Sequence, residues 1–238
     1  MKKASIILGL FFALALASGA RAETYRDEER HFSFEVPEGW KKGSGEDVAD
    51  EMALAKAFLP ETAQLVAGKA KVVMFENPAF KDSRQILLMC IGNPSKEFSP
   101  EAFHRTIRTA IERTKLQMGK LEGFQFTCNP DEVVLFSQQN RVDIPYVVSS
   151  GGVDAHVMLS YLWGDGQWVV LAYASDAAFD PVTPRAIAGS LYFAPGHEWH
   201  AAHSSIGLFT GGAAILVALV LVFGKVYLMF NPRNGSRI

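Results

Sequence analysis

Residues 153–174 read VDAHVMLSYLWGDGQWVVLAYA, and this stretch decides the fold. Two runs rich in β-branched and aromatic residues, 153–163 and 168–174, flank the short segment Gly164-Asp165-Gly166. Such a pattern is typical of two antiparallel strands joined by a tight turn. We therefore expect a β-hairpin here, with an antiparallel sheet built beside it.

A second strand signal lies near the start of the chain, where residues 31–36 read HFSFEV. Its apolar residues alternate with polar ones, as expected of a strand with one buried face. The segment Pro37-Glu38-Gly39 follows, and then Trp40. We expect a strand that ends in a turn, with the tryptophan plugging the core.

The clearest helix begins at Ser99-Pro100-Glu101, which supplies an N-cap, a proline at the first helical position and an acid behind it. Gly119 ends the pattern. Two pairs, Glu101 with Arg105 and Arg108 with Glu112, have the spacing of surface ion pairs. The expected buried face comprises Phe103, Ile107, Ala110, Ile111, Thr114 and Met118.

Other segments complete the expected fold. Shorter helices are expected in the acidic segment 46–58 and at 184–191. The predicted fold class is α+β, a mainly antiparallel sheet sandwiched by helices. Further strands are expected at 71–76, 84–92, 121–127, 132–137 and 144–148.

Three of these features together resemble the PsbP-like fold family, named for the extrinsic lumenal subunit of photosystem II and shared by bacterial periplasmic relatives. They are the motif F-S-x-x-x-P-x-G-W at 32–40, the aromatic hairpin, and AIAGSLYF at 186–193. The resemblance covers about residues 25–194. It implies an α/β/α sandwich, no common catalytic centre, and a role as an accessory or assembly module on a larger partner.

The N-terminus has the pattern of a cleaved signal peptide, residues 1–22. Lys2 and Lys3 precede an apolar run at 4–18, and Ala20-Arg21-Ala22 provides small residues before the expected cleavage at Glu23. The mature chain is therefore expected outside the cytoplasm.

The C-terminus has the pattern of a membrane anchor. Residues 206–224 contain no charge, and apolar character continues to 230, which is long enough to span a bilayer. Lys225, Arg233 and Arg237 follow without an acid, so the positive-inside rule places the tail 231–238 in the cytoplasm. We expect a single-pass protein of the inner (plasma) membrane, with an extracytoplasmic domain at 23–195 and a juxtamembrane linker at 196–205.

Charge excludes one class of partner. Residues 23–204 hold 17 basic and 25 acidic residues, a net charge of −8. A domain of this charge without a basic tract lacks the electrostatic footprint of a nucleic-acid-binding protein.

The sequence contains no recognisable catalytic motif. It has no phosphate-binding glycine loop, no G-x-S-x-G and no H-E-x-x-H, so neither an enzyme nor a cofactor is expected. His31, His104 and His156 are expected to be structural. His197, His200 and His203 form a juxtamembrane triplet, which is either a weak metal site or a polar linker.

Two further sets of residues leave alternatives open. Cys90 and Cys128 lie in a compartment where disulfides persist, and they form either one bridge or two separate buried thiols. Gly207, Gly211, Ala214 and Ala218 form one stripe of small residues along the expected span, which includes a G-x-x-x-G pair. The stripe packs against a second copy in a homodimer, packs against a partner's helix, or faces lipid.

The leading hypothesis is a non-enzymatic, membrane-anchored accessory or assembly protein whose extracytoplasmic domain binds a partner protein or complex. The alternative is an enzyme or small-ligand-binding protein whose site is assembled from scattered residues.

Overall fold

The computed structural model describes residues 23–43, 70–77, 85–92, 99–119 and 123–200. The expected signal peptide, the helix expected at 46–58, and the expected span with its small-residue stripe lie outside these residues. No helix in the described ranges is long and apolar enough to cross a membrane.

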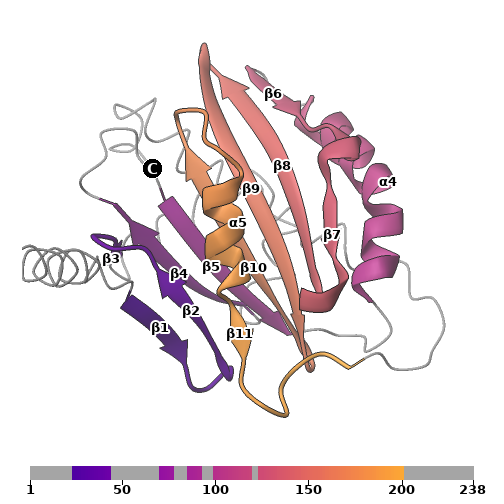
Figure 1. The fold of residues 1–238 in the computed structure, drawn as a ribbon. Helices are drawn as coiled ribbons and strands as arrows, with labels where there is room; N and C mark the ends of the chain where they lie inside the picture. Colours follow the sequence, from indigo (N-terminus) through magenta and orange to yellow (C-terminus); the bar gives the residue numbers. More distant parts are fainter. Residues whose placement is uncertain (1–22, 44–69, 78–84, 93–98, 120–122, 201–238) are drawn as a thin grey trace, which may run out of the picture.

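Two antiparallel sheets form the framework of the described chain (Figure 1). The small sheet has the order β1-β2-β11, from β1 (Glu23–Asp27), β2 (Phe32–Val36) and β11 (Tyr192–Phe193). The large sheet has the order β3-β4-β5-β10-β9-β8-β6, and β7 also pairs with β8. Its strands are β3 (Lys41–Lys42), β4 (Ala70–Glu76), β5 (Gln85–Gly92), β6 (Phe124–Thr127), β7 (Val134–Phe136), β8 (Arg141–Ser150), β9 (Val153–Gly164) and β10 (Gln167–Ser175).

The predicted hairpin lies at the centre of the large sheet. β9 and β10 pair in register from Gly164↔Gln167 to His156↔Ser175, and Gly166 takes the positive φ of 67° in the connecting turn. Nearly every residue of both strands is buried, on both faces of the sheet. The alternation of side chains along a strand thus gives the molecule two apolar layers.

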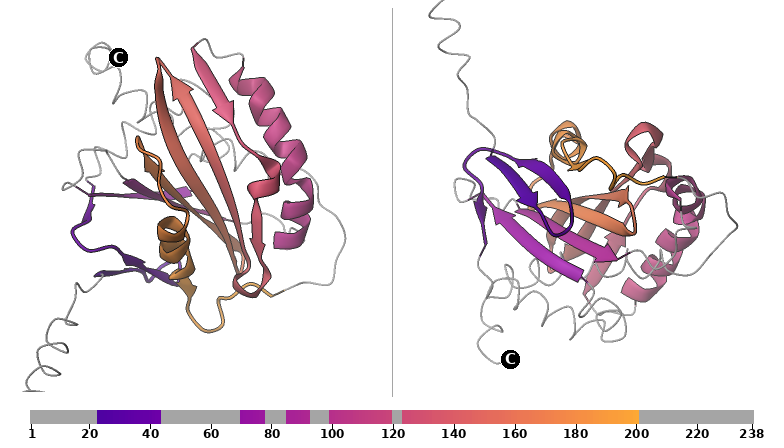
Figure 2. Two further views of the ribbon diagram at one scale, coloured as in Figure 1. Left: turned by 45° about the horizontal axis from the view of Figure 1, so that its top comes forward. Right: turned by 90° about the horizontal axis from the view of Figure 1, so that it is seen from below.

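The small sheet and α5 (Val182–Gly189) cover one face of the large sheet (Figure 2). The hydrophobic core between them joins Phe32, Phe34 and Val36 of β2 to Leu162 of β9 and Leu171 of β10. Phe193 and Ile187 belong to the same core. The small sheet is therefore held by burial of its inward side chains against the hairpin.

The helix α4 (Pro100–Met118) packs on the opposite side of β9. The ring of Phe103 lies 4.9 Å from that of Tyr161 and 5.3 Å from that of Trp163. Ser99 caps the helix, since its Oγ accepts a hydrogen bond from the N–H of Ala102 at 3.1 Å. The predicted start is confirmed, and the buried face includes Phe103, Ile107, Ile111 and Thr114.

The motif at 32–40 also folds as predicted. Burial alternates along β2, and the N–H of Trp40 donates to the carbonyl of Pro37 at 3.2 Å to close the turn. Gly39 has a φ of 79°, and Trp40 is buried with its ring 6.0 Å from that of Tyr173. The tryptophan therefore fills the core at the end of β2.

Several local predictions need correction. The short strands β1, β3 and β11 were not anticipated, and the segment expected as a strand at 132–137 contains β7 between the 3₁₀ turns η1 (Pro130–Glu132) and η2 (Ser137–Gln139). Arg108 does not bond Glu112: it pairs with Asp131 at 2.7 Å, while Glu112 pairs with Lys115 at 3.1 Å. Tertiary contact with η1 offers Arg108 a closer acid than its own helix does.

One glycine is required by close packing. A Cβ on Gly164 would lie 2.7–2.8 Å from the Cζ and Cδ1 atoms of Phe193. We expect Gly164→Ala to lower the free energy of unfolding by about 1–3 kcal/mol, the usual cost of overpacking a core. Urea unfolding measures this loss. In a Phe193→Leu background the same substitution should cost less, and an equal cost in both backgrounds would contradict the proposed clash.

Candidate functional site

Three segments meet at one end of the molecule: the β1–β2 turn (28–31), the β9–β10 turn (165–166), and residues 194–200 after β11 (Figure 1). The N–H of Ala194 donates to the carbonyl of His31 at 2.8 Å, and the N–H of Asp165 donates to that of His197 at 2.9 Å. Gln167 Nε2 donates to the carbonyl of Arg30 at 2.6 Å. These bonds join the three segments into one surface.

Two histidines reinforce this junction. The imidazole rings of His31 and His197 stack with centroids 3.8 Å apart and planes 16° from parallel. His31 takes the left-handed backbone conformation, with a φ of 55°. This conformation is uncommon for a residue other than glycine, and here the hydrogen bond to Ala194 and the stacking hold it.

A buried carboxylate fixes the β1–β2 turn from the other side. Asp27 accepts a hydrogen bond from the N–H of Arg30 at 3.1 Å and pairs with Lys71 Nζ of β4 at 2.8 Å. The hydrogen bond to Asp27 raises the pKa of Lys71. Asp27 therefore serves the fold, and its oxygens are occupied.

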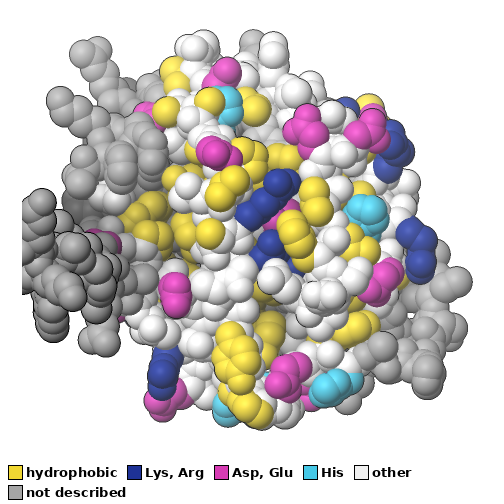
Figure 3. Space-filling view, in the orientation of Figure 1, with side chains coloured by type: hydrophobic (Ala, Val, Ile, Leu, Met, Phe, Trp, Pro, Cys, Tyr) yellow, Lys and Arg dark blue, Asp and Glu magenta, His cyan; other side chains and the backbone are white. Residues whose placement is uncertain are grey.

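Beside this turn lies an open groove of about 410 Å³. Tyr192, with 53% of its surface exposed, stands in its wall. At the lower end of the face in Figure 3, hydrophobic, acidic and histidine side chains gather together. The groove is lined by Arg26, Asp27, Glu28, His31, Phe32, Ser33, Tyr192 and Ala194.

A second charged cluster is buried under α5. Asp143 is fully buried and lies 3.1 Å from Arg141 Nε and 3.6 Å from Arg185 Nε. Arg141 Nη1 also donates to the carbonyl of Arg185 at 3.4 Å, and its guanidinium covers the ring of Phe136. In Figure 3 basic and acidic side chains meet inside a hydrophobic surround at the place that α5 and β8 occupy in Figure 1.

Burial governs the protonation of this cluster. It raises the pKa of Asp143, a rise that Arg141, the Ser160 hydroxyl and Arg185 oppose, and it lowers the pKa of Arg141. Each charge compensates the other's desolvation. The cluster therefore ties α5 to β8.

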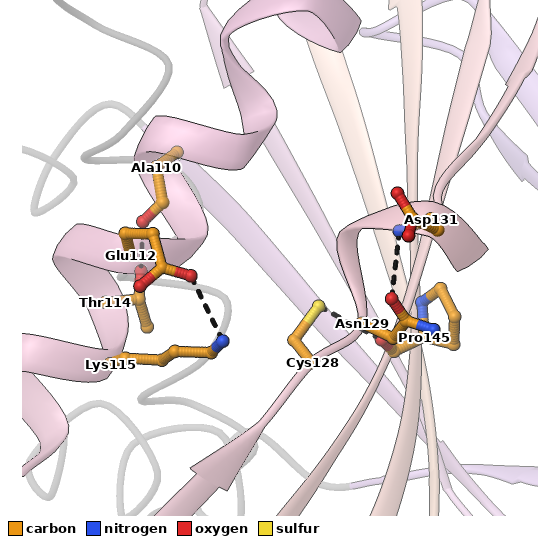
Figure 4. A network of polar contacts seen from close by, with 8 residues as sticks. All are labelled: Ala110, Glu112, Thr114, Lys115, Cys128, Asn129, Asp131 and Pro145. Atoms are coloured by element: carbon orange, nitrogen blue, oxygen red, sulfur yellow. Dashed lines mark hydrogen bonds and ion pairs between the residues drawn. The ribbon is translucent and has the colours of Figure 1, made fainter.

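Cys90 and Cys128 do not form a disulfide bridge in the structure. Cys128 is a free, buried thiol whose Sγ donates to the carbonyl of Pro145 at 3.3 Å (Figure 4). Cys90 lies in β5, and β10, β9 and β8 intervene before β6, which ends next to Cys128. Four strand spacings amount to about 19 Å, whereas the Cα atoms of a disulfide lie about 4–7 Å apart.

The predicted histidine triplet is only partly described. His197 turns to His31, His200 is exposed, and His203 lies outside the described residues. In the ranges that the structure covers, no three His, Cys, Asp or Glu side chains gather as metal ligands would. Glu198 accepts a hydrogen bond from the N–H of Gly196 at 2.7 Å, and backbone N–H groups lower its pKa.

The groove was missed by sequence reasoning because its walls come from residues 26–33 and 192–194, far apart in the chain. The sequence predicts a structural role for His31, and in the structure its ring stacks on that of His197. The tyrosine in YF at 192–193 follows a short helix without any pattern that indicates exposure.

Comparison with family models and with curated proteins finds no match. Among solved structures, the chain is similar to the cyanobacterial PsbP protein (CyanoP) of Synechocystis, with a TM-score of 0.47 and 15% identity over 74% of this chain and 94% of that one. It is also similar to a protein from Bacteroides thetaiotaomicron, with a TM-score of 0.44 and 8% identity over 74% of this chain and 50% of that one.

The buried cluster under α5 can be tested by removing one partner. Arg141→Met leaves the carboxylate of Asp143 buried beside a half-exposed Arg185, and should lower the free energy of unfolding at neutral pH by about 3–5 kcal/mol. Without the positive charge of Arg141, less opposes the effect of burial, so the pKa of Asp143 rises further. The loss should therefore shrink as the pH falls below the folded-state pKa, because the folded chain binds the extra proton.

Two controls define this test, measured by urea unfolding between pH 4 and 7. Arg108→Met removes an exposed pair and should cost at most about 1 kcal/mol. Arg141→Met with Asp143→Leu should recover most of the stability, since neither charge is left buried alone. Equal losses in Arg141→Met and Arg108→Met would contradict the assigned role.

The buried thiol of Cys128 should make the stability of the protein depend on pH in the alkaline range. Burial raises its pKa to about 12 from an ordinary 9.0, so its contribution to stability is complete below pH 9 and falls as the pH rises toward 12. Cys128→Ser keeps a donor for Pro145 without a thiol that ionises. The stability difference between the two proteins should change by about 1.4 kcal/mol per pH unit from pH 9 to 11. A constant difference would show that the thiol is accessible.

Proposed function

We propose that this protein is a membrane-anchored accessory module, whose extracytoplasmic domain binds a partner protein or complex. The sequence supports the proposal with the pattern of a signal peptide before residue 23, an uncharged stretch from residue 206, and the net charge of −8 at 23–204. The motif at 32–40 resembles the PsbP-like fold family, and that resemblance implies the same kind of role.

One observation carries the preference for a binding module. The buried carboxylates of the described domain are paired with basic side chains in ways that hold elements together, Asp27 with Lys71 and Asp143 with two arginines. Structural pairing accounts for their burial, and the exposed side chains of Arg26, Glu28 and His31 line the groove. A surface of this kind suits recognition.

The groove favours a second candidate, a protein that binds a small ligand. Its volume of about 410 Å³ falls within the range of ligand sites, and Arg26, Glu28 and His31 converge on it. Crosslinking in native membranes followed by mass spectrometry distinguishes the two candidates. A protein adduct recovered in stoichiometric yield supports the accessory module, and its absence favours the ligand-binding protein.

The small-residue stripe adds a finer proposal within the membrane. Gly207, Gly211, Ala214 and Ala218 permit close approach of a second helix, from another copy or from a partner.

The proposed topology makes a direct prediction. N-terminal sequencing of the mature protein should begin at Glu23, because the small residues at Ala20 and Ala22 fit signal peptidase. A phosphatase reporter, active only outside the cytoplasm, should be inactive when fused after Ile238. An active reporter there would refute the orientation.

The anchor makes a second prediction. Deleting residues 205–238 should release a folded, soluble domain, because the core of the described residues lies between 32 and 193. Circular dichroism and a cooperative urea transition measure folding. Recovery of the truncated chain only as aggregate, when the full chain is folded in detergent, would contradict an autonomous domain.

A further inference from the structure

We propose that the groove beside Tyr192 binds the headgroup of a zwitterionic phospholipid in the outer leaflet, with Arg26 on the phosphate and Glu28 and the Tyr192 ring on the ammonium. The proposal rests on the proposed membrane anchor, and it assigns a ligand to the end of the domain that holds the groove.

The length of the chain between domain and span brings the groove near the bilayer. The described domain ends at His200 and the uncharged stretch begins at Ile206, so five residues separate them. Fully extended, that connection reaches about 20 Å. His200 belongs to the same end as the groove, because residues 194–197 bond the β1–β2 turn and the β9–β10 turn. The lipid surface is therefore within reach of this end.

The groove presents one basic and one acidic side chain, which can bind the two opposite charges of a zwitterion. Arg26 and Glu28 are both exposed, and within the described part of the chain neither forms an ion pair. Asp27, between them in sequence, points inward to Lys71. A guanidinium binds phosphate oxygens through several N–H donors, and a carboxylate attracts an ammonium group.

Tyr192 supplies the third element. It is one of three large exposed hydrophobic side chains in the described residues, the others being Leu116 of α4 and Val182 of α5. A tyrosine ring suits the membrane interface because it has an apolar body and a polar tip, and its face attracts ammonium cations.

The charges around the groove select the class of lipid. The acids at this end, Asp27, Glu28, Glu29, Asp165 and Glu198, outnumber the bases Arg26, Arg30 and Lys71. An anionic membrane surface would be repelled by the excess of acids, whereas a zwitterionic headgroup carries no net charge. Phosphatidylcholine is therefore a suitable probe.

Photocrosslinking tests the occupant directly. The full chain is reconstituted in phosphatidylcholine vesicles with labelled choline headgroups, with p-benzoylphenylalanine in place of Tyr192 or, as a control, of Val182. Val182 is similarly exposed but begins α5, which follows the end of β10 away from the β9–β10 turn (Figure 1). We expect labelled adduct at position 192 at least fivefold above that at 182. Equal adduct at both positions would overturn the proposal.

Charge variants test the assigned chemistry. Arg26→Gln and Glu28→Gln should each reduce the adduct at position 192 several-fold, whereas Arg108→Gln, which removes an exposed arginine on α4, should not. No effect of either groove variant would overturn the headgroup assignment. In native membranes, a protein adduct at 192 in place of lipid would also overturn it.

Alkaline carbonate extraction separates the two proposals. A chain that resists extraction but gives no lipid adduct at position 192 overturns the groove assignment alone and leaves the anchor standing. A chain that carbonate releases from the vesicles overturns the anchor, and the groove assignment falls with it.

Discussion

Burial of β9 and β10 on both faces is the constraint on which the rest of the structure depends. A strand covered on both sides needs an apolar layer above and below it, and the chain provides these layers from distant segments: β2, α5 and β11 on one face and α4 on the other. The polar groups within these layers must then be paired, because an unpaired buried charge is costly. The cluster of Asp143 with two arginines meets this requirement where α5 crosses β8.

The same arrangement positions the candidate site. Docking of β11 beside β2 returns the chain to the β1–β2 turn, and Gly164 leaves room for the ring of Phe193 next to the turn of the hairpin. Residues 194–197 then bond both turns. The groove is therefore a product of long-range packing, and its two walls are placed by the hydrophobic core. Its exposed charged side chains, Arg26 and Glu28, are available for binding because they are not packed in the core.

Sequence alone predicted the elements whose signal is local. The alternation in Phe32-Ser33-Phe34, the cap at Ser99 and the apolar runs around Gly166 are periodic or positional patterns, and each marks an element that the structure contains. β1 and β11 were missed because they are short and gain stability only by pairing with β2. The separation of Cys90 from Cys128 depends on strand order, and the meeting of His31 with His197 depends on the pairing of β11 with β2; periodicity encodes neither.

Amide hydrogen exchange of the full chain tests most directly whether the hairpin is the centre on which the other elements depend. Opening β9 and β10 requires loss of both apolar layers, so their amides should exchange slowest, at the rate of global unfolding. The amides of β1, β2 and β11 should exchange faster, because the small sheet can detach from one face while the hairpin remains paired. Exchange in β1 and β2 as slow as in β9 and β10, or fast exchange within the hairpin, would contradict the account.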